Sequence, residues 1–350
     1  MTPLKKRITA LIETGGPLSV ADYMALCLFD PQHGYYTTRE PFGVAGDFTT
    51  APEISQMFGE LIGIWIRLAW ESTDKPLPVA IAEIGPGRGT LMKDMLRTLA
   101  RLAPELFPVA RFSMIETSPR LAAIQKKTLA TTDAAVEWHV TLDTLPQMPL
   151  IIVGNELFDA IPIRQFVRTS GQWRERCIGL DEQGELRFVA GAASLDPSLL
   201  PESAANASDG AIFEVGPART ALMDAISQRI NAHGGAGLFI DYGHAEPGIG
   251  DTLQALRKHR YADILGEPGR ADLTAHVDFA SLAATARQHG LDATLMTQGD
   301  FLLDLGLLER AGRLGAQADT ATQEKIRGEV ERLAGPDAMG TLFKVLVVRF

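Results

Sequence analysis

Cysteine is scarce in this chain: its 350 residues include only Cys27 and Cys177. Two cysteines cannot build a disulfide framework or a cysteine-based metal centre, so we expect a reducing compartment. The seven histidines show neither the H-E-x-x-H pattern nor a clustered spacing with cysteine. The sequence therefore predicts no metal site.

The chain also lacks a long apolar run and an excess of positive charge. Its most apolar early segment, residues 61–70, is interrupted by Arg67, and no run reaches the length of a membrane span. The 33 basic and 43 acidic residues give a formal net charge of -10. That balance argues against nonspecific binding to nucleic acid or to an anionic membrane, so we expect neither a nucleic-acid partner nor membrane insertion.

The most informative stretch that is present combines an apolar run, an acid and three alternating glycines. The run ends in Glu83, and Gly85, Gly87 and Gly89 follow. Glycine is required where the chain turns sharply or where a ligand touches the backbone. Residues 90–102 have helical composition, so the first amides of this helix would face the same ligand. The stretch predicts a nucleoside-binding loop.

The spacing of these glycines indicates which nucleoside binds. A dinucleotide loop reads G-x-G-x-x-G, but Thr90 occupies the third glycine position here, which makes a dehydrogenase a poor alternative. The pattern E-x-G-x-G-x-G is similar to motif I of class I S-adenosylmethionine (SAM) methyltransferases. A second apolar run ends in Glu116, whose carboxylate can accept both ribose hydroxyls. The residues predicted to bind SAM on this basis are Glu83, Gly85, Gly87, Gly89 and Glu116.

Apolar runs and helical patterns alternate along the chain, as in a doubly wound α/β sheet. Residues 165–189 alternate apolar and polar side chains around glycine turns, which predicts inserted antiparallel strands, and residues 190–210 resemble a loose linker. Residues 302–338 have a helical pattern before a final apolar strand over 342–350. The core strands are expected at residues 79–83, 110–116, 135–139, 150–154 and 237–241.

Four further segments resemble one known family. They read YY at 35–36 with GVAGDFTTAPEIS at 43–55, GNELFDAIP at 154–162, FIDYGH at 239–244 and ADLTAHVDF at 271–279. Together with motif I they closely resemble the MidA-like family, bacterial relatives of a mitochondrial complex I assembly methyltransferase. The resemblance spans nearly the whole chain, although His276 stands where family members commonly carry aspartate.

The resemblance implies a class I methyltransferase fold with a Rossmann-like sheet, an N-terminal helical cap and inserted β-hairpin and helical segments. It also implies SAM as methyl donor and, for mitochondrial members, arginine methylation of a complex I subunit. We expect a helical cap with a lid loop over residues 1–72 and a SAM-binding core over 73–350. Insertions in this core are expected at about 163–210, 245–278 and 302–338.

Polar residues follow the fourth expected strand, at the edge where open α/β sheets bind their ligands. The side-chain carbonyl of Asn155 can orient an N–H donor, and the Glu156 carboxylate can pair with a guanidinium. The alternative is a capping pair that begins a helix. Asp159 is either a second guanidinium acceptor or an acid on a helix surface. The candidate catalytic residues are Asn155, Glu156 and Asp159.

Two other regions carry candidate ligand contacts. The family resemblance favours a lid over residues 43–55, with Asp47, Thr49 and Pro52 near the cofactor and Glu53 near the substrate. The alternative is a surface loop in which Ser55 or Thr50 caps the next helix. The end of the fifth strand supplies candidate substrate contacts, although a buried tyrosine hydroxyl and a helix cap explain them almost as well. These candidates are Asp241, Tyr242 and His244.

The leading hypothesis is therefore a SAM-dependent protein methyltransferase that modifies arginine on a partner protein, with a complex I subunit as the candidate acceptor. The alternatives are a small-molecule methyltransferase and a SAM-binding assembly factor with little catalysis. The basic cluster at residues 5–7 resembles the positively charged start of a signal peptide, but Glu13 interrupts the apolar stretch after only a few residues. We expect the cytoplasm of a bacterium, or the mitochondrial matrix of a eukaryote, and either a monomer or a homodimer.

Overall fold

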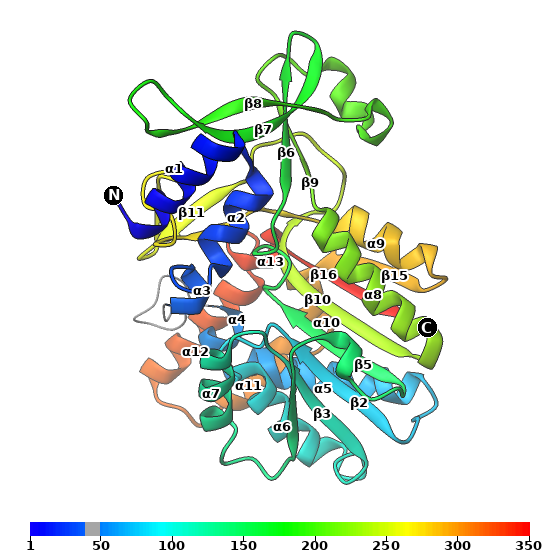
Figure 1. Cartoon of the computed structure of the whole chain (residues 1–350). Helices are drawn as coiled ribbons and strands as arrows, with labels where there is room; N and C mark the ends of the chain where they lie inside the picture. The colour runs from blue at the N-terminus through cyan, green and yellow to red at the C-terminus, as the bar shows by residue number, and fades with distance from the viewer. Residues whose placement is uncertain (39–49) are drawn as a thin grey trace. The chain divides into compact units, whose positions relative to one another are not determined.

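The computed structural model of the protein describes residues 1–38 and 50–350 (Figure 1). The chain forms two compact units that are interleaved in sequence. The first unit consists of the described residues of Met1–Phe48, Phe158–Ala221 and Glu246–Asp278. The second unit consists of the described residues of Thr49–Leu157, Leu222–Ala245 and Phe279–Phe350.

Seven strands of the second unit form the central sheet. Their order is β15-β16-β10-β5-β2-β3-β4, and β16 runs antiparallel to both of its neighbours. Their bounds are β2 (Val79–Ile84), β3 (Ala110–Ile115), β4 (Val136–His139), β5 (Leu150–Asn155), β10 (Gly235–His244), β15 (Asp292–Thr297) and β16 (Phe343–Arg349). The chain order reverses between β2 and β5, which is where open α/β sheets bind ligands. The expected Rossmann-like α/β class is confirmed.

Helices flank this sheet, and several begin at sequence-encoded caps. Ser118 accepts the amide of Leu121 at the start of α7, and Ser55 accepts that of Met57 at the start of α5, as one alternative expected. The helices are α4 (Ala51–Ile54), α5 (Gln56–Ser72), α6 (Thr90–Leu102), α7 (Pro119–Thr128), α9 (Phe279–Gln288), α10 (Gln298–Asp304), α11 (Leu307–Gly315), α12 (Thr320–Ala334) and α13 (Met339–Leu342). Helix α8 (Pro217–His233) contributes to both units.

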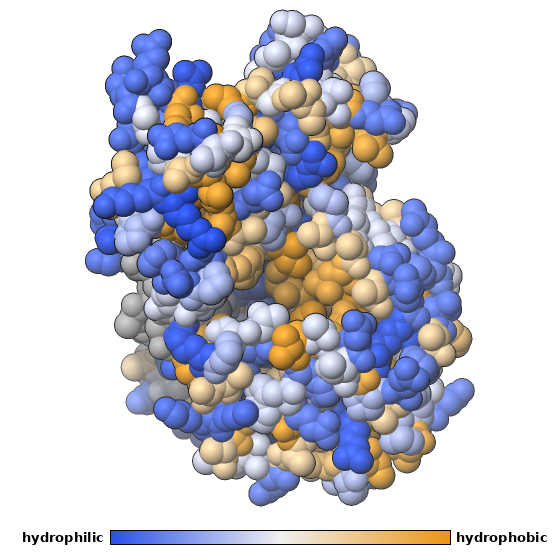
Figure 2. All heavy atoms as spheres, viewed as in Figure 1, coloured by the Kyte–Doolittle hydropathy of each residue, from blue (hydrophilic) through white to orange (hydrophobic). Residues whose placement is uncertain are grey.

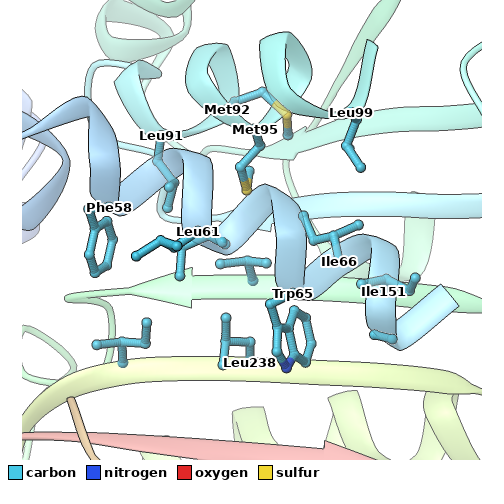
Figure 3. Close-up of a cluster of buried hydrophobic side chains, with 14 of the residues drawn as sticks. Phe58, Leu61, Trp65, Ile66, Leu91, Met92, Met95, Leu99, Ile151 and Leu238 are labelled. Carbon is cyan, nitrogen blue, oxygen red and sulfur yellow. The ribbon is translucent and has the colours of Figure 1, made fainter. Parts of the chain in front are cut away.

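Helix α5 packs deep within the second unit. Its side chains Phe58, Leu61 and Trp65 lie between α6 and the strands β5 and β10 (Figure 3). The whole apolar face is buried within one chain, including Ile62 and Trp70. This face therefore belongs to the core of the unit. The division into units places α5 with the sheet, whereas the sequence-based boundary at residue 72 grouped it with the cap.

The first unit is built on antiparallel strands and the N-terminal helices. Its larger sheet has the order β1-β7-β6-β9, with β8 paired to β7, and its smaller sheet has the order β12-β11-β13. Residues 190–194, expected in the linker, extend β8, and two short 3-10 helices follow, Pro197–Leu199 and Glu202–Asn206. The other elements are α1 (Pro3–Gly15), β1 (Leu18–Ser19), α2 (Val20–Phe29), α3 (Tyr35–Thr38), β6 (Arg164–Thr169), β7 (Gln172–Leu180), β8 (Leu186–Ser194), β9 (Ile212–Val215), β11 (Gln254–Arg257), β12 (Arg260–Ala262), β13 (Asp272–Thr274) and β14 (Val277–Asp278).

The surface of the protein mixes hydrophilic and apolar side chains. Hydrophilic residues cover much of the face shown in Figure 2, and apolar residues appear among them in patches. Within residues 1–38 and 50–350, none of the helices combines the length and the apolar character that a membrane crossing requires.

Candidate cofactor and active site

The glycine loop connects β2 to α6 at the switch point of the sheet. Gly85, Gly87 and Gly89 have φ angles of 67°, 51° and 80°, which lie in the left-handed region that favours glycine. A Cβ at position 85 would lie 2.9 Å from Cδ1 of Leu157, in the loop after β5. The loop needs glycine for its backbone conformation, and at Gly85 also for the close approach of the neighbouring loop.

Glu83 lies buried just before this loop. Burial raises the pKa of its carboxyl group well above the ordinary value, and a hydrogen bond from the Met92 backbone partly offsets that effect. Its Oε2 atom is buried and has no hydrogen-bond partner in the described part of the chain. A buried acceptor without a partner beside a glycine loop fits a ligand that brings its own N–H or O–H donors. The site thus fits the amine- and hydroxyl-bearing cofactor that the sequence predicted.

Glu116 follows β3, the strand next to β2. Its Oε1 accepts the Ser118 amide at 2.7 Å, and its Oε2 accepts Nε2 of Gln125 at 2.9 Å. Burial raises the pKa of the Glu116 carboxyl, and these hydrogen bonds act in the opposite direction because they stabilise the charged form. A fixed carboxylate at this strand end is suited to accept ribose hydroxyls.

Gln125 and Trp138 also lie at this site and are not among the residues predicted from the sequence. Gln125 is fully buried in α7, where its Nε2 also donates to the Gly87 carbonyl oxygen at 2.9 Å. The Trp138 indole Nε1 donates to Oε1 of Gln125 at 3.0 Å. One signal was available: Gln125 shares helical spacing with Leu121 and Leu129, both buried, so it is a polar residue on an apolar face.

Asn155 and Glu156 lie where β5 ends. Asn155 is 9 % exposed, and its Nδ2 donates to Oε1 of Glu156 at 3.2 Å. This bond fixes the amide orientation and leaves Asn155 Oδ1 buried, with no hydrogen-bond partner among the described residues. Glu156 has a φ of 49°, an uncommon value for a residue other than glycine. Such backbone strain occurs most often at functional sites.

The short helix α4 contacts both the loop after β5, at Glu156, and the start of α6, at Thr90. Its first amide, at Ala51, donates to Oε1 of Glu156 at 3.1 Å. Glu53 accepts the Thr90 hydroxyl at 2.6 Å and lies 3.8 Å from the Arg88 guanidinium. Pro52 is buried in the same helix. These partners place Glu53 beside the glycine loop, and its contact with the substrate stays a prediction.

The predicted substrate contacts Asp241, Tyr242 and His244 lie at the end of β10. Asp241, fully buried in β10, accepts the Tyr242 amide at 2.9 Å, and the Tyr242 ring packs edge-on against Phe343 at 5.5 Å. His244 is the last residue of β10 and is half-buried. Asp47 and Thr49 lie outside the described residues.

Asp159 belongs to the first unit, where it is buried. Its backbone carbonyl accepts the Arg219 guanidinium at 3.0 Å and the Ala275 amide at 3.1 Å. Arg219 is itself 4 % exposed and also donates to carbonyl oxygens of residues 161, 275 and 276. The sequence reasoning did not select Arg219, which joins two segments of this unit.

The sheet order, the left-handed glycine loop and the two acidic strand ends define a nucleoside-binding α/β protein of the methyltransferase class. A family model described as "Putative S-adenosyl-L-methionine-dependent methyltransferase" matches residues 61–297. The chain belongs to this family, and SAM is its cofactor.

Similar proteins extend this assignment over the whole chain. Protein arginine methyltransferase NDUFAF7, mitochondrial, from Homo sapiens is 34% identical over 372 residues, covering 98% of this chain and 82% of that protein. The protein of the same name from Danio rerio is 32% identical over 366 residues, covering 98% and 86%. A Burkholderia thailandensis crystal structure bound to S-adenosyl-homocysteine (SAH) has a TM-score of 0.87 at 28% identity, covering 99% of this chain and 92% of that one. The family resemblance seen in the sequence is confirmed.

Proposed function

We propose that this protein is a protein arginine N-methyltransferase. The observation that carries the proposal is the buried acceptor Oδ1 of Asn155, without a partner among the described residues, beside the strained Glu156 at the end of β5. This corner adjoins the glycine loop, because Leu157 packs where a Cβ of Gly85 would lie. The names of the relatives from Homo sapiens and Danio rerio support arginine as the acceptor.

A guanidinium group suits this pair of side chains. It carries only N–H donors and stays cationic, with a pKa above about 12. Asn155 Oδ1 would accept one N–H, and the Glu156 carboxylate would hold the planar group and draw positive charge away from the attacking nitrogen. SAM, when bound, supplies an electrophilic methyl group on its sulfonium sulfur.

Two steps of the reaction fall to residues of this chain. A Glu156 carboxylate oxygen accepts the proton that leaves the guanidinium nitrogen as the nitrogen–carbon bond forms. Asn155 and Glu156 together hold that nitrogen in line, and alignment is the main contribution to the rate because no covalent enzyme intermediate is needed.

We infer further that the acceptor is a protein, with a complex I subunit as the candidate that the family resemblance implies. In a bacterium the reaction would take place in the cytoplasm. The acceptor would present an arginine side chain to the Asn155–Glu156 corner. Identification of the labelled protein tests these assignments.

The test is transfer of labelled methyl from SAM into proteins of a lysate that lacks this protein. We expect a discrete labelled band with the wild type that yields methylarginine on hydrolysis, and none with Gly87→Val, which forces a β-branched residue to a φ of 51°. Label that appears only in small molecules, or SAM binding without transfer, would contradict the proposal.

Glu156→Gln tests the corner itself. An amide oxygen at this position can still accept the Ala51 amide, so the local structure is kept while the charge is lost. We expect the transfer rate to fall by about a hundredfold or more, with SAH affinity within about threefold of the wild type. Glu137→Gln, at a half-exposed carboxylate on β4, is the matched control and should transfer at the wild-type rate.

A further inference from the structure

Gln125 is the centre of a buried hydrogen-bond network beside the cofactor loop. Its Nε2 donates to the Gly87 carbonyl and to Glu116 Oε2, both at 2.9 Å. Its Oε1 accepts the Trp138 indole at 3.0 Å. A single side chain thus joins the glycine loop after β2, the acidic residue after β3 and a tryptophan of β4.

Trp138 determines which way the Gln125 amide faces. An indole N–H can only donate, so the amide oxygen must lie toward it and both amide hydrogens toward Gly87 and Glu116. Without Trp138, the buried amide oxygen of Gln125 would lose its donor, which favours a shift of the side chain away from Gly87 and Glu116. Trp138 therefore acts on Glu116 through Gln125.

The network also fixes both oxygens of the Glu116 carboxylate. Oε1 is held by the Ser118 amide at 2.7 Å and Oε2 by Gln125, so the group cannot rotate freely. A carboxylate selects a pair of vicinal hydroxyls only when its oxygens are held in one orientation, because both hydrogen bonds must form at once. The ribose of SAM carries such a pair of hydroxyls.

We propose that Gln125, oriented by Trp138, is the positioning residue that gives the cofactor site its selectivity for a nucleoside with both ribose hydroxyls. The inference rests on Glu116 as the ribose-binding carboxylate and on SAM as cofactor. It does not depend on the methyl acceptor, so it can fail while the arginine proposal stands, and the reverse is also true.

The test compares the equilibrium affinities of the full chain for SAH and for the 2′-deoxy analogue of SAH. A hydrogen bond to a charged carboxylate makes the wild type favour the ribose form by about tenfold to a hundredfold. Gln125→Met keeps the length of the side chain but removes the donor, and should reduce this preference to about threefold or less. Glu116→Gln should reduce the preference similarly.

Gln298→Met is the matched control. Gln298 is also fully buried in the second unit, and its Nε2 donates to the Leu333 carbonyl at 2.8 Å. This substitution removes a buried amide from the same unit without touching Glu116. It should leave the preference for the ribose form at the wild-type value, which separates selectivity from a general loss of packing.

Trp138→Phe keeps the test decisive if Gln125→Met does not fold. It keeps the Gln125 and Glu116 side chains but leaves the buried amide oxygen of Gln125 without its donor. The side chain should then shift away from Glu116, and the preference should again fall. In Gln125→Glu, the new carboxylate would repel Glu116 at neutral pH, and SAH affinity should recover on acidification as the substituted group becomes a donor. A preference that stays at the wild-type value in Gln125→Met or Trp138→Phe, or that persists in Glu116→Gln, would overturn the proposal.

Discussion

Replacing Gly89 with alanine should weaken cofactor binding through Gln125. Gly89 precedes α6 with a φ of 80°. A Cβ there would lie 3.3 Å from the Met114 methyl carbon and 3.4 Å from Cγ of Gln125. The substitution therefore adds a backbone strain and pushes on the side chain that holds Glu116.

Gly184→Ala is the control for the effect of backbone strain alone. Its φ is 79°, and a Cβ there would meet nothing within 4 Å. Alanine in the left-handed conformation costs about 1–2 kcal/mol, so both substitutions should lower the free energy of unfolding by about this amount. The contacts at position 89 require Gln125 or Met114 to move by a few tenths of an ångström. Weakening one hydrogen bond to the charged Glu116 should then raise the SAH dissociation constant about tenfold or more.

The assay pairs urea unfolding with calorimetric titration of SAH for the wild type and both variants. We expect similar losses of stability in Gly89→Ala and Gly184→Ala, and weaker SAH binding in Gly89→Ala alone. Wild-type SAH affinity in Gly89→Ala would refute the link between loop geometry and Gln125. Equal weakening in both variants would show that affinity follows general stability instead.

Two further predictions concern stability. Arg219→Met should lower the free energy of unfolding by about 3 kcal/mol or more, because it removes the donor from four backbone carbonyls within residues 159–161 and 275–276, two of them in buried and two in partly buried bonds. Urea unfolding checks this, and a loss below about 1 kcal/mol would contradict it. Burial raises the pKa of Asp94 to about 6, so the native state binds its proton at higher pH than the unfolded chain. The free energy of unfolding should therefore fall as pH rises from about 4 to about 6. Asp94→Asn should flatten this pH dependence when unfolding is measured across the range. An unchanged pH dependence in Asp94→Asn would show that other groups cause it.

The sheet and the cofactor loop could be predicted because their determinants are local. The ends of the first four core strands were predicted to within one residue. For β2 and β5 the reason is that buried parallel strands are continuous apolar runs, whereas β3 and β4 are less buried and mix apolar with polar residues. The fifth, β10, runs from Gly235 to His244 and is longer than the expected 237–241, because glycine and polar residues hide its ends from an apolar pattern. The glycines and the following helix occupy one continuous segment, and its pattern needs no knowledge of distant contacts.

The supporting contacts of the site could not be predicted in the same way. Gln125 and Gly87 are 38 positions apart, and Glu156 and Ala51 are 105 positions apart. Such bonds depend on how the loops meet in space, and no pattern within one segment encodes the partner. The candidate acids could therefore be chosen from local patterns, whereas the residues that hydrogen-bond to them could not.

Helix α4 links the loop after β5 to the start of α6 through two hydrogen bonds. Its first amide, at Ala51, binds Glu156 beyond β5, and its third residue, Glu53, binds Thr90 at the start of α6. A helix of four residues has little freedom between two such bonds, so the loop after β5 and the start of α6 are held at a fixed separation. If the acceptor is held at Glu156, as we propose, methyl transfer would depend on this separation, because a displacement of about 1 Å can cost a hundredfold in rate. On this proposal Glu53 would contribute to alignment through its bond with Thr90, and its contact with the substrate stays a prediction from the sequence.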